Sequence, residues 1–269
     1  MLLLTAFCAL ITLVPLFSIF TYVISKGITS LNFAFFTHLP KPVGETGGGM
    51  GNAIAGTLTL VGMACLWALP VGIFTGVYLA EFGNRKESMF IRFTCDVLTG
   101  VPSIVIGIFA YELFVLPMKS FSALSGAFAL GFMMIPTVAR TTEEMVRRVP
   151  HTYREAALAL GITRYKTTLH IVLKTALPGI VTGALLAIAR VAGETAPLLF
   201  TAFGNQFWQH KLTQPIAALP LQIFVYAISP FKDWHRQAWA GALVLISIIF
   251  LTTLLSRLTL GRKNYIVNR

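Results

Sequence analysis

The sequence predicts an all-α integral membrane protein with six transmembrane helices, and three observations lead to this class. Its 269 residues are 56% hydrophobic and 12% charged, whereas a soluble domain carries roughly a quarter charged residues. The mean hydropathy is +0.76. Six stretches reach or approach the ~20 apolar residues that a helix needs to cross a bilayer. These predicted spans are Met1–Ser25, Asn52–Ala80, Phe93–Leu116, Leu124–Ala139, Gly179–Phe200 and Gln237–Ser256.

The spans divide the chain into one membrane domain with two external segments and one large cytoplasmic loop. Two pairs of glycines at helical spacing predict close helix packing in lipid, Gly72 with Gly76 and Gly179 with Gly183. The predicted divisions are a first transmembrane helix at 1–25, an external segment at 26–51, a core at 52–256 that includes the cytoplasmic loop 140–178 and the external segment 201–236, and a cytoplasmic tail at 257–269.

The distribution of lysine and arginine predicts the orientation of the chain. There are 21 of these residues, and the formal net charge is +11. Fourteen lie between the second and third spans, in the loop 140–178 and after the sixth span, against six on the opposite side. Because basic residues concentrate on the cytoplasmic side of membrane proteins, both termini are predicted to be cytoplasmic. The positive charge then faces lipid headgroups, and no nucleic-acid partner is expected.

The loop 140–178 is predicted to fold as a helix, a sharp turn and a second helix. The first part, Thr141–Leu160, reads as a helical stretch broken near Pro150, and Gly161 then ends it as a C-terminal glycine does. Thr163 is placed to cap the helix that follows. On physical grounds alone, an alternative is a basic amphipathic loop that lies on the inner leaflet.

The order of residues in this loop favours a more specific interpretation. Glu155, Ala156 and Ala157 are followed by Gly161 six residues after the glutamate, and by Ile171 ten residues after that glycine. This pattern closely resembles the EAA loop of the permease subunits of ABC importers. The resemblance implies that these residues form a coupling helix seated in a cleft of an ATP-binding subunit. It also implies the six-helix architecture of type I ABC importer permeases.

The loop departs from the family pattern at one point. The pattern ends in Ile-x-Leu-Pro, but here Leu173 is followed by Lys174, and a Leu-Pro pair comes later at Leu177 and Pro178. Since proline does not continue a helix without a kink, the second helix of the loop is predicted to run longer than in the common form of the family.

Two charged residues interrupt the fifth predicted span. Arg190 and Glu194 lie near the middle of an otherwise apolar stretch, where a charge costs about 3 kcal/mol on insertion scales. Four residues apart on a helix, they share a face and can form a pair. A guanidinium suits a tetrahedral oxyanion because its planar fork donates two parallel hydrogen bonds. The sequence therefore predicts a substrate pathway at this pair, the alternative being an ion pair that only holds helices together.

The surroundings of this pair resemble the phosphate-specific permeases of ABC importers, and the resemblance covers nearly the whole chain. It implies a heterodimer with a second, related permease, two copies of an ABC ATPase and an extracytoplasmic phosphate-binding protein, in the cytoplasmic membrane of a bacterium or archaeon. The stretches that carry the resemblance are Ala189–Ala202, Asn205–Trp208, Gln214–Ile216, Leu219–Pro220, Pro102–Val105 and Gly47–Gly49.

Other functional motifs are missing from the sequence. No G-x-x-x-x-G-K-[ST] pattern occurs, so ATP and magnesium are expected on the partner ATPase, with no cofactor on this chain. The five histidines and three cysteines show no metal-ligand spacing, which predicts no metal site. No nucleophile–base arrangement is recognisable, so no catalytic residue and no enzyme activity are expected.

Three questions stay open at this stage. The cargo could be another oxyanion, such as sulfate or molybdate. The chain could instead be an ion-coupled secondary transporter or channel, and the loop from Glu155 to Gly161 is the feature that argues against this. Finally, the external segment 201–236 is rich in tryptophan, phenylalanine and proline, which is typical of an interfacial aromatic belt or of a surface that docks a partner or gates the pathway.

Overall fold

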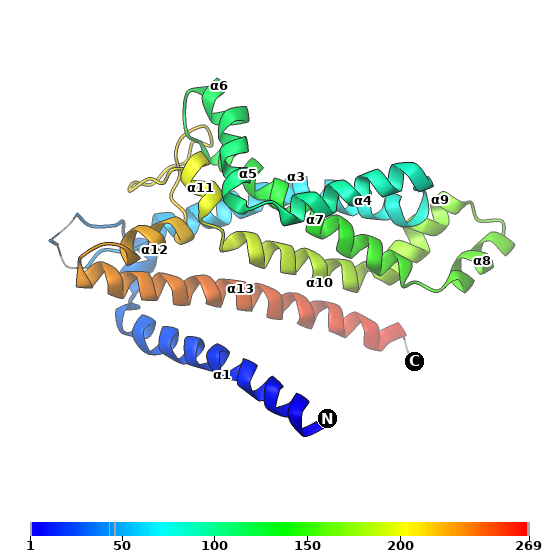
Figure 1. Ribbon diagram of the computed structural model, residues 1–269, viewed down its shortest axis with the longest axis horizontal. Helices are drawn as coiled ribbons and strands as arrows, with labels where there is room; N and C mark the ends of the chain where they lie inside the picture. Colours follow the sequence, from blue (N-terminus) through cyan, green and yellow to red (C-terminus); the bar gives the residue numbers. More distant parts are fainter. Residues whose placement is uncertain (1, 43, 46, 268–269) are drawn as a thin grey trace.

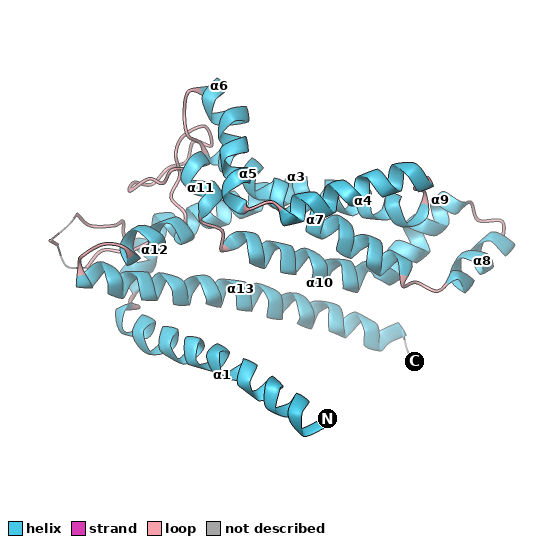
Figure 2. Cartoon of the chain, in the orientation of Figure 1, coloured by secondary structure: helices cyan, strands magenta, loops and turns pink. Residues whose placement is uncertain are grey.

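The computed structural model describes residues 2–42, 44–45 and 47–267. In these ranges the chain folds into helices joined by loops, with one isolated bridge between Phe203 and Ile216 (Figures 1 and 2). The long helices are α1 (Leu2–Gly27), α3 (Gly51–Glu81), α4 (Arg85–Gly100), α7 (Ala123–Arg147), α10 (Leu173–Ala192) and α13 (Lys232–Val267). The shorter helices are η1 (Ile28–Ser30), α2 (Phe33–Thr37), α5 (Ser103–Ala110), η2 (Tyr111–Val115), α6 (Leu116–Met118), α8 (His151–Ala159), α9 (Arg164–Thr167), η3 (Thr168–Val172), α11 (Ala196–Thr201) and α12 (Leu219–Ala227).

The predicted all-α membrane class is confirmed. Among the described residues, five helices are long and apolar enough to cross a membrane, and a sixth span results if one bent pair of helices is counted as a single crossing. The five are Leu10–Ser30, Gly51–Glu81, Ala123–Arg147, Arg164–Ala192 and Lys232–Leu254.

The first and last spans have different bounds from those predicted. The first membrane-length segment is Leu10–Ser30, and α1 continues beyond Ser25 to Gly27. At the other end, α13 begins at Lys232 and its backbone stays helical to Val267, through most of the predicted tail. The last two residues of that tail lie outside the described part of the chain.

The centre of the molecule is the contact of α3 with α7, which lie side by side. A Cβ atom on Gly76 would lie 2.5 Å from the carbonyl oxygen of Ala139, and one on Gly72 would lie 2.8 Å from the Cβ of Val138. The backbones therefore approach as closely as only glycine allows, as the glycine spacing predicted. Gly183 of α10 contacts Thr141 of α7 in the same way.

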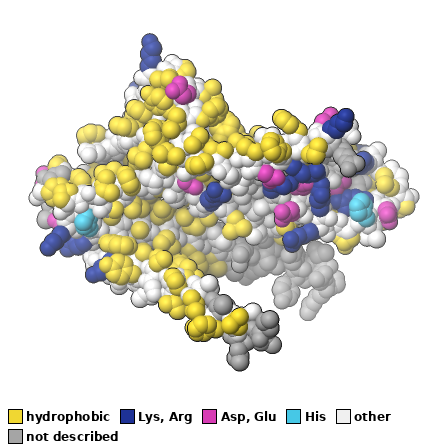
Figure 3. All heavy atoms as spheres, viewed as in Figure 1, with side chains coloured by type: hydrophobic (Ala, Val, Ile, Leu, Met, Phe, Trp, Pro, Cys, Tyr) yellow, Lys and Arg dark blue, Asp and Glu magenta, His cyan; other side chains and the backbone are white. Residues whose placement is uncertain are grey.

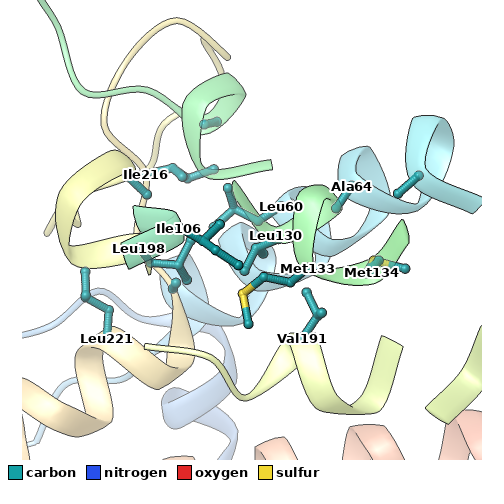
Figure 4. Close-up of a cluster of buried hydrophobic side chains, with 14 residues drawn as sticks. Leu60, Ala64, Ile106, Leu130, Met133, Met134, Val191, Leu198, Ile216 and Leu221 are labelled. Carbon is teal, nitrogen blue, oxygen red and sulfur yellow. The ribbon is translucent and has the colours of Figure 1, made fainter. Parts of the chain in front are cut away.

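A cluster of buried apolar side chains fills the space between α3, α5, α7, α10 and α11 (Figure 4). Leu130 and Leu198 are at most 2% exposed and lie at its centre. Met133 and Met134, half-way along α7, belong to the same cluster, and so does Val191 of α10. The cluster therefore fixes the end of α10 at the level of the middle of α7.

The third predicted span, Phe93–Leu116, is wrong as a single straight helix. The chain bends by 103° between the segments Lys86–Gly100 and Ser103–Met118. Pro102 has no N–H to donate and pushes the preceding residue into extended backbone, and Val101 accordingly has φ −68° and ψ 131°. Hydropathy counts the apolar residues on both sides of this bend but does not detect a change of direction.

The fifth predicted span, Gly179–Phe200, is also wrong in its bounds. Its helix begins at Arg164, passes through Pro178 and ends at Ala192, where Gly193 caps it. Pro197 opens the next short helix, α11, because proline is tolerated in a first helical turn and not in a helix interior. Residues 193–195 therefore form a break inside the apolar stretch.

Candidate functional site

The loop 140–178 has the predicted shape, with α8 between two turns. Helix α7 ends at Arg147, and Pro150, in extended backbone with ψ 141°, precedes α8. At the other end, Gly161 has φ +76°, its N–H donates to the carbonyl of Leu158 over 2.9 Å, and the N–H of Ile162 donates to the carbonyl of Ala157 over 3.0 Å. This pair of bonds is the Schellman motif, which requires a left-handed residue at Gly161.

The second helix of the loop is long and continues into the membrane span. It runs from Arg164 to Ala192 through a π-helical turn at Thr168–Val172, and it contains Pro178. Thr163 stands at its N-cap position, but its side chain accepts no hydrogen bond there. The expected side-chain cap is therefore wrong, although the residue is in the expected place.

The predicted coupling residues divide between two faces of α8. Ala157 is 2% exposed and faces the membrane helices, whereas Glu155 and Ala156 are exposed, as is Gly161 after the helix. The small side chain of Ala157 thus lets α8 lie close to the helix that follows it in the same chain. Glu155 is exposed and lines a cavity that Glu81 and Arg154 also line.

Three large apolar side chains close to Glu155 in the sequence are exposed, which hydropathy alone did not predict. Tyr153 is 50% exposed, Leu160 79% and Tyr165 65%. They sit on a charged loop beyond the apolar spans, where large apolar side chains on a surface indicate an interaction site. The signal available in the sequence was the presence of two tyrosines and a leucine in a segment that also carries several charged residues.

A buried ion pair ties α8 to the end of α3. Arg154 Nε donates to Glu81 Oε1 over 2.9 Å, and Arg154 Nη2 contacts the same oxygen. Arg154 also donates to the carbonyls of Val149 over 2.8 Å and Val146 over 3.1 Å at the end of α7. Arg164 of α9 donates to the backbone carbonyl of Glu81. These partners are far apart in the sequence, so no local pattern could reveal them.

A second buried carboxylate, Glu143, joins α7 to α4. Its side chain is 4% exposed, and it pairs with Arg92 over 2.7 Å, with Arg147 over 2.9 Å and with Arg140 over 3.2 Å. Arg140 also reaches Asp96 of α4 over 3.0 Å. Figure 3 shows charged side chains gathered toward the end of the molecule that carries α8, whereas most of the remaining visible surface is hydrophobic.

The predicted pathway pair forms, but loosely. Arg190 Nε lies 3.9 Å from Glu194 Oε1, and the two side chains are 51% and 21% exposed. Of the described residues, Glu194 is the only acidic one within ion-pair distance of Arg190. Arg190 lies in the last turn of α10 and Glu194 in the break that follows, so the prediction of a mid-helix pair is wrong. The pair still lies at the level of the middle of α7, because neighbouring Val191 belongs to the same buried cluster as Met133 and Met134.

The segment 201–236, which was predicted to be external, is folded and contains α12. Tyr226 is buried there and stacks on Trp234 with ring centroids 4.5 Å apart, and this burial raises the pKa of the Tyr226 phenol. Phe207, by contrast, is 71% exposed. The aromatic residues of this segment thus include core side chains as well as surface ones. In the described residues, no group of three or more potential metal ligands comes together.

The comparison with known protein families identifies the class of the chain. Residues 68–262 match the family described as "Binding-protein-dependent transport system inner membrane component". The chain belongs to this family. It is accordingly a multi-pass protein of the inner membrane and a transport component rather than an enzyme, as predicted.

Individual relatives show which kind of transport permease the chain resembles. The chain is 47% identical over 247 residues to the "Phosphate transport system permease protein PstA" of Xylella fastidiosa, covering 91% of this chain and 85% of the relative. It is 45% identical over 243 residues to the protein of the same name from Yersinia pestis, covering 90% and 82%. The predicted resemblance to phosphate-specific ABC permeases is confirmed.

The fold matches a solved importer. A chain of the bacterial ABC transporter "involved in the import of the acidic polysaccharide alginate" superposes with a TM-score of 0.67, covering 96% of this chain and 95% of that one at 13% identity. At this identity the match concerns the fold alone. The predicted architecture of an ABC importer permease is confirmed, and such a permease acts with an ATPase, a further permease and a substrate-binding protein.

Proposed function

We propose that this chain is one of two related permeases in an ATP-driven phosphate importer, in which it forms half of the translocation pathway. The observation that carries the proposal is its similarity, over about nine-tenths of its length, to permeases named for phosphate transport. The partners are a second permease, two copies of an ABC ATPase and an extracytoplasmic phosphate-binding protein. With the loop 140–178 toward the ATPase, both termini are cytoplasmic.

Helix α8 is the part that meets the ATPase. Glu155 and Ala156 lie on its exposed face, and Tyr153, Leu160 and Tyr165 add apolar surface around them. Ala157 keeps α8 close to the membrane helices, and Gly161 permits the sharp return of the chain. A protrusion that combines charged and exposed apolar side chains fits a cleft in a protein partner, since exposed apolar side chains outside the spans indicate an interaction site.

Arg190 and Glu194 provide the pathway for phosphate. The 3.9 Å separation exceeds hydrogen-bond range, so the guanidinium keeps its donors for an anion. Glu194 offsets the charge of Arg190 when no anion is bound, which makes the site a moderate attractor that also allows release. The pair lies at central depth in a break between helices, where irregular backbone is tolerated only if protein or water covers it.

Reconstitution tests the proposal directly. The complete complex is placed in vesicles with ATP on the ATPase-facing side and labelled phosphate on the binding-protein side. Phosphate accumulation that needs both ATP and the binding protein is the expected result. Uptake of sulfate or molybdate without phosphate would refute the cargo, and uptake that continues without the ATPase would refute the class.

A variant in α8 tests the coupling role. Glu155→Lys is expected to remain in the membrane yet to lose both transport and co-purification of the ATPase, since it reverses the charge on the exposed face of α8. The control is Lys41→Gln. Lys41 is an exposed residue of the external segment, so this substitution should change neither property. Normal ATPase association in Glu155→Lys would remove α8 from the coupling interface.

A further inference from the structure

We infer that Glu81 is a positioning residue for coupling: its buried carboxylate holds α8 through Arg154, so that a displacement of α8 by the ATPase is passed to α3. This inference rests on the proposed role of α8 and assigns the next link beyond it. It concerns a residue at the end of a membrane helix that faces neither the ATPase nor the anion.

The contact is tight, and solvent hardly reaches it. The side chain of Glu81 is 5% exposed and that of Arg154 is 15% exposed. Arg154 binds Glu81 through both Nε and Nη2, while its remaining donor capacity goes to backbone carbonyls at the end of α7. Arg164 approaches from the far side of the turn, donates to the Glu81 carbonyl and lies over the Phe82 ring at 5.3 Å. Arg154 within α8 and Arg164 after it therefore both bind the end of α3.

Helix α8 has few other attachments. Among the described residues of α8, only Ala157 is buried, and only Arg154 has a side-chain hydrogen bond or ion pair to another element. A cavity of about 360 Å³ separates it from the helix ends, lined among others by Arg147, Leu158 and Thr168. In Figure 1, α8 accordingly lies at one extremity of the molecule, beyond the ends of α7 and α10. With so little packing, the Arg154–Glu81 pair dominates how α8 moves relative to the membrane helices.

Helix α3 in turn reaches the opposite side of the membrane. Near its other end, Thr57 Oγ1 accepts the backbone N–H of Leu219 over 2.7 Å, and Asn52 Nδ2 donates to the carbonyl of Asn205 over 2.8 Å. Both partners belong to the external segment 201–236. A continuous helix of 31 residues, which contains Pro70, thus joins the Glu81 contact to the external segment without passing through the break at residues 193–195.

The test measures how much ATP the reconstituted complex hydrolyses for each phosphate it moves. Glu81→Gln keeps the size of the side chain and removes its charge. We expect this complex to retain its ATPase subunits and to hydrolyse at least about fivefold more ATP per phosphate, the lower end of typical coupling between sites. Because the two side chains act as one unit, the double variant Glu81→Gln/Arg154→Gln should have the same ratio as Arg154→Gln alone.

Glu144→Gln is the matched control, because it makes the same chemical change on an exposed side chain at the same end of the bundle; its ratio should stay at the wild-type value. An unchanged ratio in Glu81→Gln would overturn the inference, and so would additive effects in the double variant. Absence of the Glu81→Gln chain from the membrane would also overturn it, since Glu81 would then serve folding rather than coupling.

The variant Glu155→Lys, measured in the same assay, separates this inference from the proposed function. If Glu155→Lys transports normally, α8 does not couple and both proposals fail. If Glu155→Lys is inactive while Glu81→Gln has a normal ratio, only the role of Glu81 fails.

Discussion

The two groups of charged residues in this chain differ in almost every physical respect. At the end with α8, the carboxylates of Glu81 and Glu143 are at most 5% exposed and are bound directly by arginines. In the middle of the bundle, Arg190 and Glu194 stand 3.9 Å apart with half of the arginine side chain exposed. Buried pairs fix geometry because breaking one leaves an uncompensated charge. A loose pair keeps its donors available, so the difference separates a structural use of charge from a binding use.

The largest expected effect comes from removing the available guanidinium. Arg190→Gln should reduce phosphate uptake by at least about 100-fold, because losing two hydrogen bonds to a charged group costs about 3 kcal/mol or more. The amount of assembled complex should not change, since the pair contributes little to packing. Uptake into vesicles, together with co-purification of the ATPase, measures both.

Arg190→Lys is the matched variant for this prediction. It keeps the charge but lacks the planar fork, so uptake should fall between the Gln variant and the wild type. Wild-type uptake in Arg190→Gln would contradict the binding role and leave only a structural one.

At Glu143, a large effect is expected on the stability of the chain rather than on the binding of phosphate. Glu143→Gln leaves Arg92, Arg140 and Arg147 without their shared carboxylate, and breaking a buried ion pair costs about 3–5 kcal/mol. The detergent-solubilised chain should therefore unfold at a lower denaturant concentration. Glu144→Gln, next to it but exposed, should unfold like the wild type. Equal stability of the two variants would show that the Glu143 network does not hold α4 on α7.

Gly161 tests the loop with a smaller change. A β-branched residue at φ +76° is strained by about 1–2 kcal/mol, so Gly161→Val should weaken co-purification of the ATPase about tenfold. Asparagine visits this backbone region more readily, and a Cβ at Gly161 would meet no atom within 4 Å. Gly161→Asn should therefore retain most of the association. Equal loss in both variants would indicate that the partner touches Gly161 itself.

The smallest effect is expected at Glu194. Its distance to Arg190 is that of a weak pair, worth about 1 kcal/mol or less. Glu194→Gln should therefore alter phosphate uptake only about two- to fivefold, through slower release from the unopposed arginine. The dependence of the uptake rate on phosphate concentration measures this change. A loss as large as that of Arg190→Gln would mean that Glu194 orients the guanidinium rather than offsetting its charge.

Composition and local pattern predicted most of the fold. The apolar stretches gave the class, the glycine pairs gave the close contacts of α3 and α10 with α7, and Gly161 gave the turn after α8. The errors arose where an apolar stretch changes direction, at Pro102 and again between Gly193 and Pro197. Both signals were in the sequence, but an average over hydropathy does not respond to a backbone break.

The buried pairs could not be predicted in the same way. Glu81 and Arg154 are 73 residues apart, and Arg92 and Glu143 are 51 apart. Each residue taken alone resembles an ordinary charge at the end of a membrane helix. Only the packing of α3, α4 and α7 brings them together, whereas Arg190 and Glu194 are neighbours on one turn and were visible as a pair.

The break between α10 and α11 has a consequence for the biogenesis of the protein. The break interrupts the regular helical hydrogen bonds. The N–H groups of Gly193 and Glu194 donate to the carbonyls of Arg190 and Val191, but other backbone groups of the break need partners from outside the two helices. Lipid tails supply no hydrogen bonds, so a newly inserted subunit cannot rest with this segment against the bilayer. Its lifetime in the membrane should then depend on how soon a companion subunit covers the break, which ties the supply of one subunit to that of the other.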